Sequence, residues 1–526
     1  MKSAAVFLLI FVLINIVYSN ELSQYQDDHP SSGEPSKLNL ANKTLEPEEN
    51  WFEQKLDHFN TINEYIIWKQ RYFMNDKFYR HNSDAPIFLT IGGELAISSR
   101  WVTMGAWIEF AEHFGALCFH LEHRFYGKSQ PRSDLSYENL KYLSSKQALA
   151  DVANFIESMN QKYSLSCKQK WIVFGGSYPG ALAAWAREKY SHLIHGAISS
   201  SAPILANFFF FFLIREYLCL EYFQVVKASL ATHSAQCVEA FGRAFAVIET
   251  LLRHEIGRRD LNEKFNTCTP IEDSIANHLD ISNFFRKLAD NIAGVIQFNN
   301  IKRPDANYTI DEVCNVMVNT TIGPPVDRLG VVSGILLEKA KEKCLDYKYE
   351  KMLSEMKNIS WQSKVANGTR QWTYQTCNEF GFYQTSNNRS DTFGDRFKVD
   401  FFIKQCMDIY SESMNATYLE RVVAETNRQF GGLNPNTTNV LYVHGSIDPW
   451  HAPGLTSTNK PELPTIFIES TAHCADMYSS AETDPPQLTE ARNKIFKYLE
   501  QLLVKTRRQI LMMFFEESRE QFRRLG

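Results

Sequence analysis

Residues 170–185 read Lys-Trp-Ile-Val-Phe-Gly-Gly-Ser-Tyr-Pro-Gly-Ala-Leu-Ala-Ala-Trp, and this stretch decides the fold. An apolar, β-branched run meets two glycines and a serine, and small helix-forming residues follow. This order is typical of a nucleophile elbow, a tight strand-to-helix turn that lifts a serine hydroxyl above a sheet edge. Pro179 stands where the usual pattern has glycine, and proline is tolerated in a first helical turn. Ser177 is therefore a candidate nucleophile, with an ordinary turn as the competing interpretation.

Short apolar runs flank this turn on both sides in the sequence. They are residues 85–91, 116–121 and 196–201. Nearly continuous apolar runs of this length are typical of strands that are buried on both faces. Helical patterns at about 104–114 and 144–162 alternate with them. This alternation predicts a parallel α/β sheet, in which the loops at the carboxyl ends of the strands carry the chemistry.

The alternation stops near residue 203 and returns with apolar strands at 439–444 and 465–468. The segment between is mostly helical in character and carries most of the cysteines, which favours an inserted helical subdomain. We therefore predict the following units: an α/β part at 50–203, a helical cap insertion at 204–432, a second α/β part at 433–505 and a C-terminal tail at 506–526.

The N-terminus has the pattern of a secretory signal peptide. Met1-Lys2 precedes an apolar run that ends near Val17, and small residues follow up to Ser19. A membrane anchor is the alternative, but the run is shorter than the roughly 20 residues that span a bilayer. We predict a signal peptide at 1–19, followed by a polar disordered leader or propeptide at 20–49.

Cysteines and glycosylation sequons agree with export. Ten cysteines without a Cys-x-x-Cys pair predict several disulfides in an oxidising compartment, and they leave the pairing open. Eight sequons are candidate glycosylation sites: Asn42, Asn307, Asn319, Asn358, Asn367, Asn388, Asn415 and Asn436. The net charge of −5 is spread along the chain and gives no sign of nucleic-acid binding. No residue pattern indicates a metal site.

Two further residues complete a candidate catalytic set. A serine nucleophile needs a base, and the base needs an acid that holds its tautomer. Asp448 follows the strand at 439–444, and His473 follows the strand at 465–468. The order Ser, Asp, His, each after a strand, is that of hydrolases built on a parallel sheet. Taken singly, Asp448 could be a turn aspartate and His473 a surface histidine, but together they favour a triad.

An acyl-transfer site also needs donors for the oxyanion. The N–H of Tyr178, directly after the nucleophile, is the first candidate. The second is expected from the loop after an earlier strand, where Gly92-Gly93-Glu94 stands. A plain glycine turn is the competing interpretation of that loop.

Seven strings in this sequence, in this order, resemble one family of serine peptidases, which includes lysosomal prolyl carboxypeptidase, dipeptidyl peptidase II and thymus-specific serine protease. The strings are Gly-Gly-Glu at 92–94, Glu-His-Arg-Phe-Tyr-Gly-Lys-Ser at 122–129, Tyr-Leu-Ser-Ser-Lys-Gln-Ala-Leu-Ala-Asp at 142–151, Gly-Gly-Ser-Tyr at 175–178, Ser-Ser-Ala-Pro at 200–203, Gly-Ser-Ile-Asp-Pro-Trp at 445–450 and Ala-His-Cys at 472–474. They span about residues 51–500 and look most similar to the thymus-specific branch. Two features depart from the family pattern: Leu95 replaces a common glycine, and residues 208–220 look like an insertion.

The resemblance implies an α/β-hydrolase, with a mostly parallel sheet and a helical cap, and triad roles for Ser177, Asp448 and His473. Tyr178, Gly93, Glu94 and Trp450 are the expected oxyanion or substrate contacts. It implies hydrolysis of short peptides, often at proline, in secreted or lysosomal compartments, without a cofactor. Peptides are the expected partners, with no nucleic acid and no stable membrane anchor, and a homodimer is left open. An esterase or lipase on the same scaffold and a non-catalytic binding protein are the alternatives.

Overall fold

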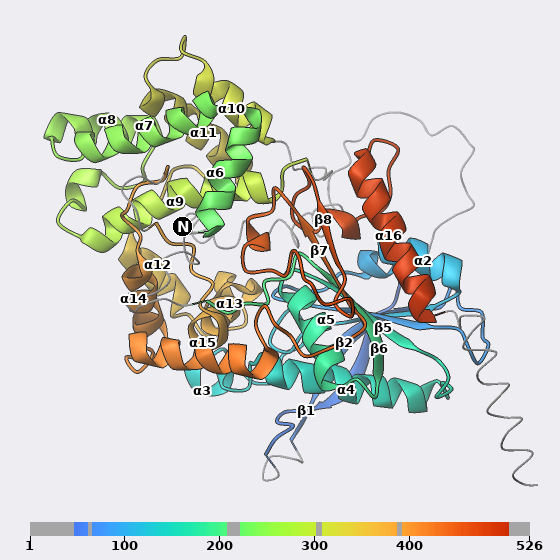
Figure 1. Cartoon of the computed structure of the whole chain (residues 1–526). Helices are drawn as coiled ribbons and strands as arrows, with labels where there is room; N and C mark the ends of the chain where they lie inside the picture. The colour runs from blue at the N-terminus through green and yellow to red at the C-terminus, as the bar shows by residue number, and fades with distance from the viewer. Residues whose placement is uncertain (1–46, 61–65, 208–220, 301–307, 387–391, 504–526) are drawn as a thin grey trace, which may run out of the picture.

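This computed structural model describes residues 47–60, 66–207, 221–300, 308–386 and 392–503 (Figure 1). Several sequence predictions fall outside these residues: the signal peptide, nearly all of the leader, the suspected insertion at 208–220, the tail, and the sequons at Asn42, Asn307 and Asn388. Among the described helices, none combines the length and the hydropathy of a membrane-spanning segment.

One eight-stranded sheet forms the centre of the molecule. Its strands are β1 (Asn50–Lys55), β2 (Ile67–Asn75), β3 (Ile87–Ile91), β4 (Leu117–Leu121), β5 (Trp171–Gly176), β6 (Ile194–Ser200), β7 (Val440–Gly445) and β8 (Thr465–Ile468). Their order is β1-β2-β4-β3-β5-β6-β7-β8. The first two strands pair antiparallel, as do β2 and β4, and every later neighbour pair is parallel. The predicted mostly parallel α/β-hydrolase sheet is confirmed.

Helices cover both faces of the sheet because its central strands are apolar throughout. Alternate residues of a strand point to opposite faces. On β3, Ile87, Leu89 and Ile91 pack with α4 (Ser145–Lys162) and α5 (Tyr178–Lys189). Phe88 points the other way, into the core shared with α2 (Ala106–Phe114) and α16 (Pro486–Leu503). The short helix α3 (Tyr137–Leu140) lies between β4 and α4 in the sequence.

Between β6 and β7 the chain forms a helical layer beside the sheet, in green to orange in Figure 1. Its helices are α6 (Glu221–His233), α7 (Ala235–Leu251), α8 (Glu255–Phe265), α9 (His278–Gln297), α10 (Ile310–Val318), α11 (Pro325–Lys339), α12 (Tyr349–Met356), α13 (Thr369–Gln375), α14 (Val399–Ile409) and α15 (Ala416–Phe430). We call these residues, 204–432, the cap, with the boundaries that the sequence predicts. A π-helix, η6 (Thr376–Phe380), continues α13.

Short 3-10 helices complete the described structure. They are η3 (Ser99–Val102), η4 (Ile271–Asp273), η5 (Lys364–Asn367), η7 (Pro449–His451) and η8 (Ala475–Met477).

Three disulfides join segments of the cap: Cys237–Cys314, Cys268–Cys344 and Cys377–Cys406. Several disulfides were expected, and these pairings were open from the sequence. Cys118, Cys167 and Cys474, outside the cap, are free thiols in the structure.

Candidate active site

Ser177 lies in a strained turn between β5 and α5. Its backbone φ is 64° and ψ is −134°, a left-handed conformation that a residue with a side chain rarely adopts. Two contacts explain the local sequence. A Cβ on Gly175 would lie 2.0 Å from the carbonyl oxygen of Pro179, so only glycine fits there. The N–H of Ser177 donates to the carbonyl of Ser200 on β6 at 2.9 Å, which fixes the turn to the sheet.

Asp448 and His473 form a buried pair at the same edge of the sheet. Asp448 follows β7 and His473 follows β8. His473 Nδ1 lies 2.7 Å from Asp448 Oδ2, and both side chains are almost fully buried. The other carboxylate oxygen, Oδ1, accepts a hydrogen bond from the N–H of Trp450 at 2.9 Å. Such a pair fixes the tautomer of the imidazole and leaves Nε2 for a second partner.

The two groups shift each other's protonation. Burial opposes charge on Asp448, but His473, the Trp450 N–H and the Ser201 hydroxyl outweigh it and lower the pKa of the carboxyl group. Burial also acts to lower the pKa of His473, yet Asp448 raises it well above its ordinary value. The carboxylate therefore increases the basicity of the imidazole, as a general base requires.

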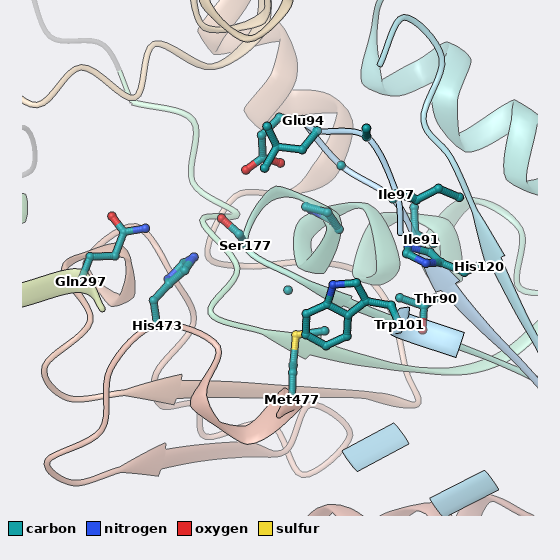
Figure 2. A pocket seen from close by; sticks show the side chains of 16 residues that line it. Thr90, Ile91, Glu94, Ile97, Trp101, His120, Ser177, Gln297, His473 and Met477 are labelled. Atoms are coloured by element: carbon teal, nitrogen blue, oxygen red, sulfur yellow. The ribbon is translucent and has the colours of Figure 1, made fainter. Parts of the chain in front are cut away.

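One pocket brings Ser177 and His473 together, and its volume is about 100 Å³. Its lining consists of residues 90–97, Trp101, His120, Gly176, Ser177, Pro179, Gln297, His473 and Met477. Figure 2 shows the Ser177 hydroxyl and the His473 ring facing the same space. Within the described residues no hydrogen bond joins Ser177 Oγ to the ring, and catalytic contacts of this kind are often long before substrate binds.

The Gly92-Gly93-Glu94 loop packs directly on the elbow. A Cβ on Gly93 would lie 2.3 Å from Pro179 Cγ, so the loop could not approach this closely with a larger residue. Tyr178 is the first residue of α5, and its N–H therefore has no acceptor within the helix. The two expected oxyanion donors thus come from segments that are in contact.

The buried carboxylate of Glu122 fixes the backbone just after this loop through hydrogen bonds. Its Oε1 accepts hydrogen bonds from the N–H of Ile97 at 3.1 Å and from Arg71 Nη2 at 2.5 Å. Its Oε2 accepts from the hydroxyl of Ser129 at 2.7 Å. The Glu-His-Arg-Phe-Tyr-Gly-Lys-Ser string therefore has a structural role next to the pocket, which its residue types alone did not indicate.

Glu94 is a buried carboxylate in the pocket lining. Burial raises its pKa to about 7, against the smaller effects of its own backbone N–H and of His473. A group with such a pKa exchanges protons near neutrality, which is common in functional sites. Glu94 is thus placed where a bound molecule would meet it.

Trp450 is not part of this lining. Trp450 instead contacts the Asp448–His473 pair from outside the pocket. Its backbone N–H donates a hydrogen bond to Asp448, and its ring Nε1 donates to Gln297 Oε1 at 3.1 Å. His444 and His451, which flank Asp448 in the sequence, also lie outside the lining. Burial lowers the pKa of His444 to about 4, and His451 Nδ1 faces the Gly445 carbonyl at 3.2 Å.

Sequence reasoning missed several lining residues. Gln297, the last residue of α9 in the cap, accepts the N–H of His473 at its backbone carbonyl, 2.9 Å away. Trp101 and Met477 come from the short helices η3 and η8. Thr90 and His120 lie inside strands and look like ordinary strand residues. No motif marks any of these five, because their roles arise from packing between distant segments.

Comparison with known proteins identifies the family. The Serine carboxypeptidase S28 family model matches residues 54–495. The chain is 34% identical over 466 residues to thymus-specific serine protease of Mus musculus, covering 87% of this chain and 88% of that protein. Identity to lysosomal Pro-X carboxypeptidase of Homo sapiens is 28% over 451 residues, covering 84% of this chain and 86% of that protein. Higher identity to the thymus-specific protein agrees with the resemblance drawn from the sequence strings.

Among solved structures, the proline iminopeptidase of Mycobacterium smegmatis matches with a TM-score of 0.35 and 12% identity, over 83% of this chain and 96% of that chain. The family match covers most of the sequence, including the elbow and both loops of the buried pair. The chain therefore belongs to the serine carboxypeptidase S28 family of serine peptidases.

Proposed function

We propose that this protein is a serine exopeptidase that hydrolyses short peptides, at proline-containing ends, through an acyl-enzyme. The observation that supports this most is the buried His473–Asp448 pair, 2.7 Å apart, whose histidine lines one pocket with a serine held at a positive φ. Strained serines at strand-to-helix turns are the usual nucleophiles of α/β-hydrolases. The peptidase family makes a peptide bond the expected target.

In the proposed mechanism, Ser177 Oγ attacks the carbonyl carbon of the scissile bond while His473 Nε2 takes the hydroxyl proton. The carbon–nitrogen bond then breaks as His473 gives that proton to the leaving amine, and the acyl group stays on Ser177. A water molecule then attacks the acyl carbon while its proton passes to His473. The bond to Ser177 Oγ breaks, His473 returns the proton to Oγ, and the acid product leaves. Asp448 stays ionised and stabilises the imidazolium in both half-reactions.

The N–H groups of Tyr178 and Gly93 are the proposed oxyanion donors. Their segments are in contact at Pro179, and a donor pair of this kind contributes about 3–4 kcal/mol per N–H to the transition state in related chemistry. Glu94, in the same lining, is proposed as a substrate contact that accepts a hydrogen bond from a peptide N–H or amino group. Trp450 would act on substrate only through Asp448 and Gln297.

The proposed preference for proline and the proposed secreted or lysosomal location are supported by a named relative, by the disulfides and by the exposed sequons. One relative is named a lysosomal Pro-X carboxypeptidase, and we extend both parts of that name to this chain as proposals. Three disulfides fit an oxidising secretory route. Five sequon asparagines in the described residues are exposed, as glycosylation requires: Asn319, Asn358, Asn367, Asn415 and Asn436. The homodimer stays a prediction.

The decisive test is Ser177→Ala, assayed on short proline-containing peptides. We expect hydrolysis to fall by at least about 10³-fold, because the nucleophile is gone while oxyanion donors and binding remain. Ser133→Ala, at an exposed serine on the surface, is the matched control and should keep wild-type turnover. Unchanged hydrolysis by Ser177→Ala, with circular dichroism showing a folded protein, would refute the proposal.

Two further measurements separate the alternatives. A fluorophosphonate probe should label wild type at Ser177, and absence of labelling would favour a non-catalytic binding protein. Turnover of acyl esters and of proline-containing peptides at equal concentration distinguishes an esterase from a peptidase.

Mass analysis of the products from one peptide with proline near both ends then shows from which end the enzyme cuts.

A further inference from the structure

Two polar side chains close the end of the pocket that lies away from His473. Thr90 on β3 and His120 on β4 are paired in the parallel register, so their side chains lie side by side on one face of the sheet. They are 6% and 5% exposed, and both line the pocket that contains Ser177. Figure 2 shows them together on one side of Trp101, with Gln297 and His473 on the other side. We call this end the side pocket.

Two polar atoms of the side pocket have no hydrogen-bond partner among the described residues. They are Thr90 Oγ1 and His120 Nδ1. Burial and the charge of Arg71 lower the pKa of His120 to about 3, against the raising effect of the Ser98 backbone. The ring is therefore neutral, with one nitrogen as donor and one as acceptor. Buried polar atoms without partners are costly, and a bound polar group relieves that cost.

The walls of the side pocket are apolar. They come from Ile97, Trp101 and Met477. The whole pocket, about 100 Å³, approaches in size a cavity that accepts a benzene ring. Apolar walls with a few convergent polar atoms are typical of a site that binds one apolar group with a polar tip. Lysine and arginine are absent from the lining among the described residues, so a carboxylate tip has no counter-charge there.

We propose that the side pocket binds one side chain of the substrate, next to the attacked carbonyl, that is apolar and ends in a hydroxyl group. Tyrosine is the larger member of this class and threonine the smaller. The hydroxyl donates to one unpartnered atom and accepts from the other, while the apolar part contacts Trp101 and Met477. This inference rests on the proposed function for its link to catalysis, but the binding itself does not require turnover.

Binding of two small probes, p-cresol and toluene, to the wild-type protein tests the proposal directly. They share a methyl-substituted ring and differ by one hydroxyl group. We expect p-cresol to bind about tenfold more tightly by titration calorimetry, the ratio that one or two hydrogen bonds give. Thr90→Val keeps the shape of the side chain and removes the hydroxyl, so the ratio should fall to about two. Its folding should survive, since the lost hydroxyl had no partner.

Ser333→Ala in the cap is the control, because it also removes a buried hydroxyl that has no hydrogen-bond partner in the described part of the chain, away from the pocket. It should keep the tenfold ratio. Equal affinity of the two probes for wild type, no binding of either, or an unchanged ratio in Thr90→Val would overturn the proposal. His120→Phe should abolish binding of both probes, because a larger ring fills the space.

Peptide kinetics then connect the side pocket to the reaction. Peptide pairs with Tyr or Phe, and with Thr or Val, on each side of the scissile bond should differ about tenfold in kcat/KM at one of the two positions. Thr90→Val should remove that difference. If peptides are hydrolysed without any such difference, the side pocket proposal is wrong while the proposed function stands. If no peptide is hydrolysed, the proposed function is wrong, and the probe titration alone decides the side pocket.

Discussion

The sheet and the cap of this peptidase are stabilised in different ways. The central strands of the sheet are buried and almost wholly apolar, and the described part of the sheet contains no disulfide. The cap contains the three disulfides found among the described residues and a set of buried ionisable groups. These include Arg286 and Asp290, paired at 2.7 Å on α9, with Lys287 beside them and Glu342 nearby. Apolar burial dominates in the central strands, whereas the cap adds disulfides and a cluster of buried ionisable groups to its own apolar core.

The difference matters because the site uses both regions. Ser177, Asp448 and His473 lie on loops at the edge of the sheet, where rigid strands fix their positions. Gln297 comes from the cap and holds the His473 loop through its backbone carbonyl. The comparison predicts that changes at the sheet edge affect the rate of reaction, and that changes in the cap affect stability first.

The largest expected effect is on the rate, from Asp448→Asn. The amide keeps the shape of the carboxylate but no longer stabilises the imidazolium, so kcat should fall about 10³–10⁴-fold. Thermal unfolding should remain cooperative. Asp273→Asn, at an exposed aspartate of the cap, is the control and should leave kcat unchanged. A variant of Asp448 that keeps more than a tenth of the wild-type kcat would remove Asp448 from the proposed mechanism.

The next effect is on the stability of the cap. Replacing both Cys377 and Cys406 with alanine removes the disulfide that joins η6 to α14. The two cysteines are 29 residues apart in the chain. Loss of such a link lowers the free energy of unfolding by about 2–4 kcal/mol. Hydrogen exchange should show faster exchange in α13 and α14 and unchanged protection of β5 and β6. The control is Cys167→Ser at an exposed free thiol. Equal loss of protection in sheet and cap would contradict a separate stabilisation of the cap.

The smallest effect concerns pH and one buried acid of the cap. Glu342 is 8% exposed, and neither carboxylate oxygen has a hydrogen-bond partner in the described residues. Burial raises its pKa to about 7, with Lys287 acting in the opposite direction. The folded protein therefore keeps a proton that the unfolded chain releases above about pH 4.5. Its contribution favours folding in acid and is lost as pH rises towards 7.

Glu342→Gln should remove this pH dependence. Between pH 5 and 7.5, wild type should lose about 2 kcal/mol more unfolding free energy than the variant, measured by urea unfolding at each pH. Glu350→Gln, at an exposed position of α12, should follow wild type. A parallel loss in wild type and Glu342→Gln would show that this carboxyl group is ionised in the folded state at pH 5.

The sequence predicted the sheet well. Short apolar runs between polar loops are a reliable sign of buried strands, because a strand that is buried on both faces contains few polar residues. The strand predicted at 465–468 is β8 (Thr465–Ile468), and the others agree within two residues at most ends. Ser177, Asp448 and His473 could be selected because each directly follows a strand, and the carboxyl ends of parallel strands meet at one edge.

The lining of the pocket could not be predicted in the same way. Gln297 and Trp450 are 153 residues apart in the chain, and only packing of the cap on the sheet brings them into contact. Thr90 and His120 read as strand residues, since sequence shows neither which face a buried strand residue points to nor whether that face is filled. The cysteine pairs were open for the same reason: three-dimensional proximity, not spacing, selects them.

The order of the sheet along the chain has a consequence for biosynthesis. Ser177 precedes Asp448 by 271 residues and His473 by another 25, and the whole cap lies between the serine and the buried pair. A growing chain therefore carries the proposed nucleophile long before it has the proposed base. The complete set forms only when β7 and β8 join the open edge of β6, after the cap has been made. A partly synthesised chain therefore lacks the complete proposed catalytic set.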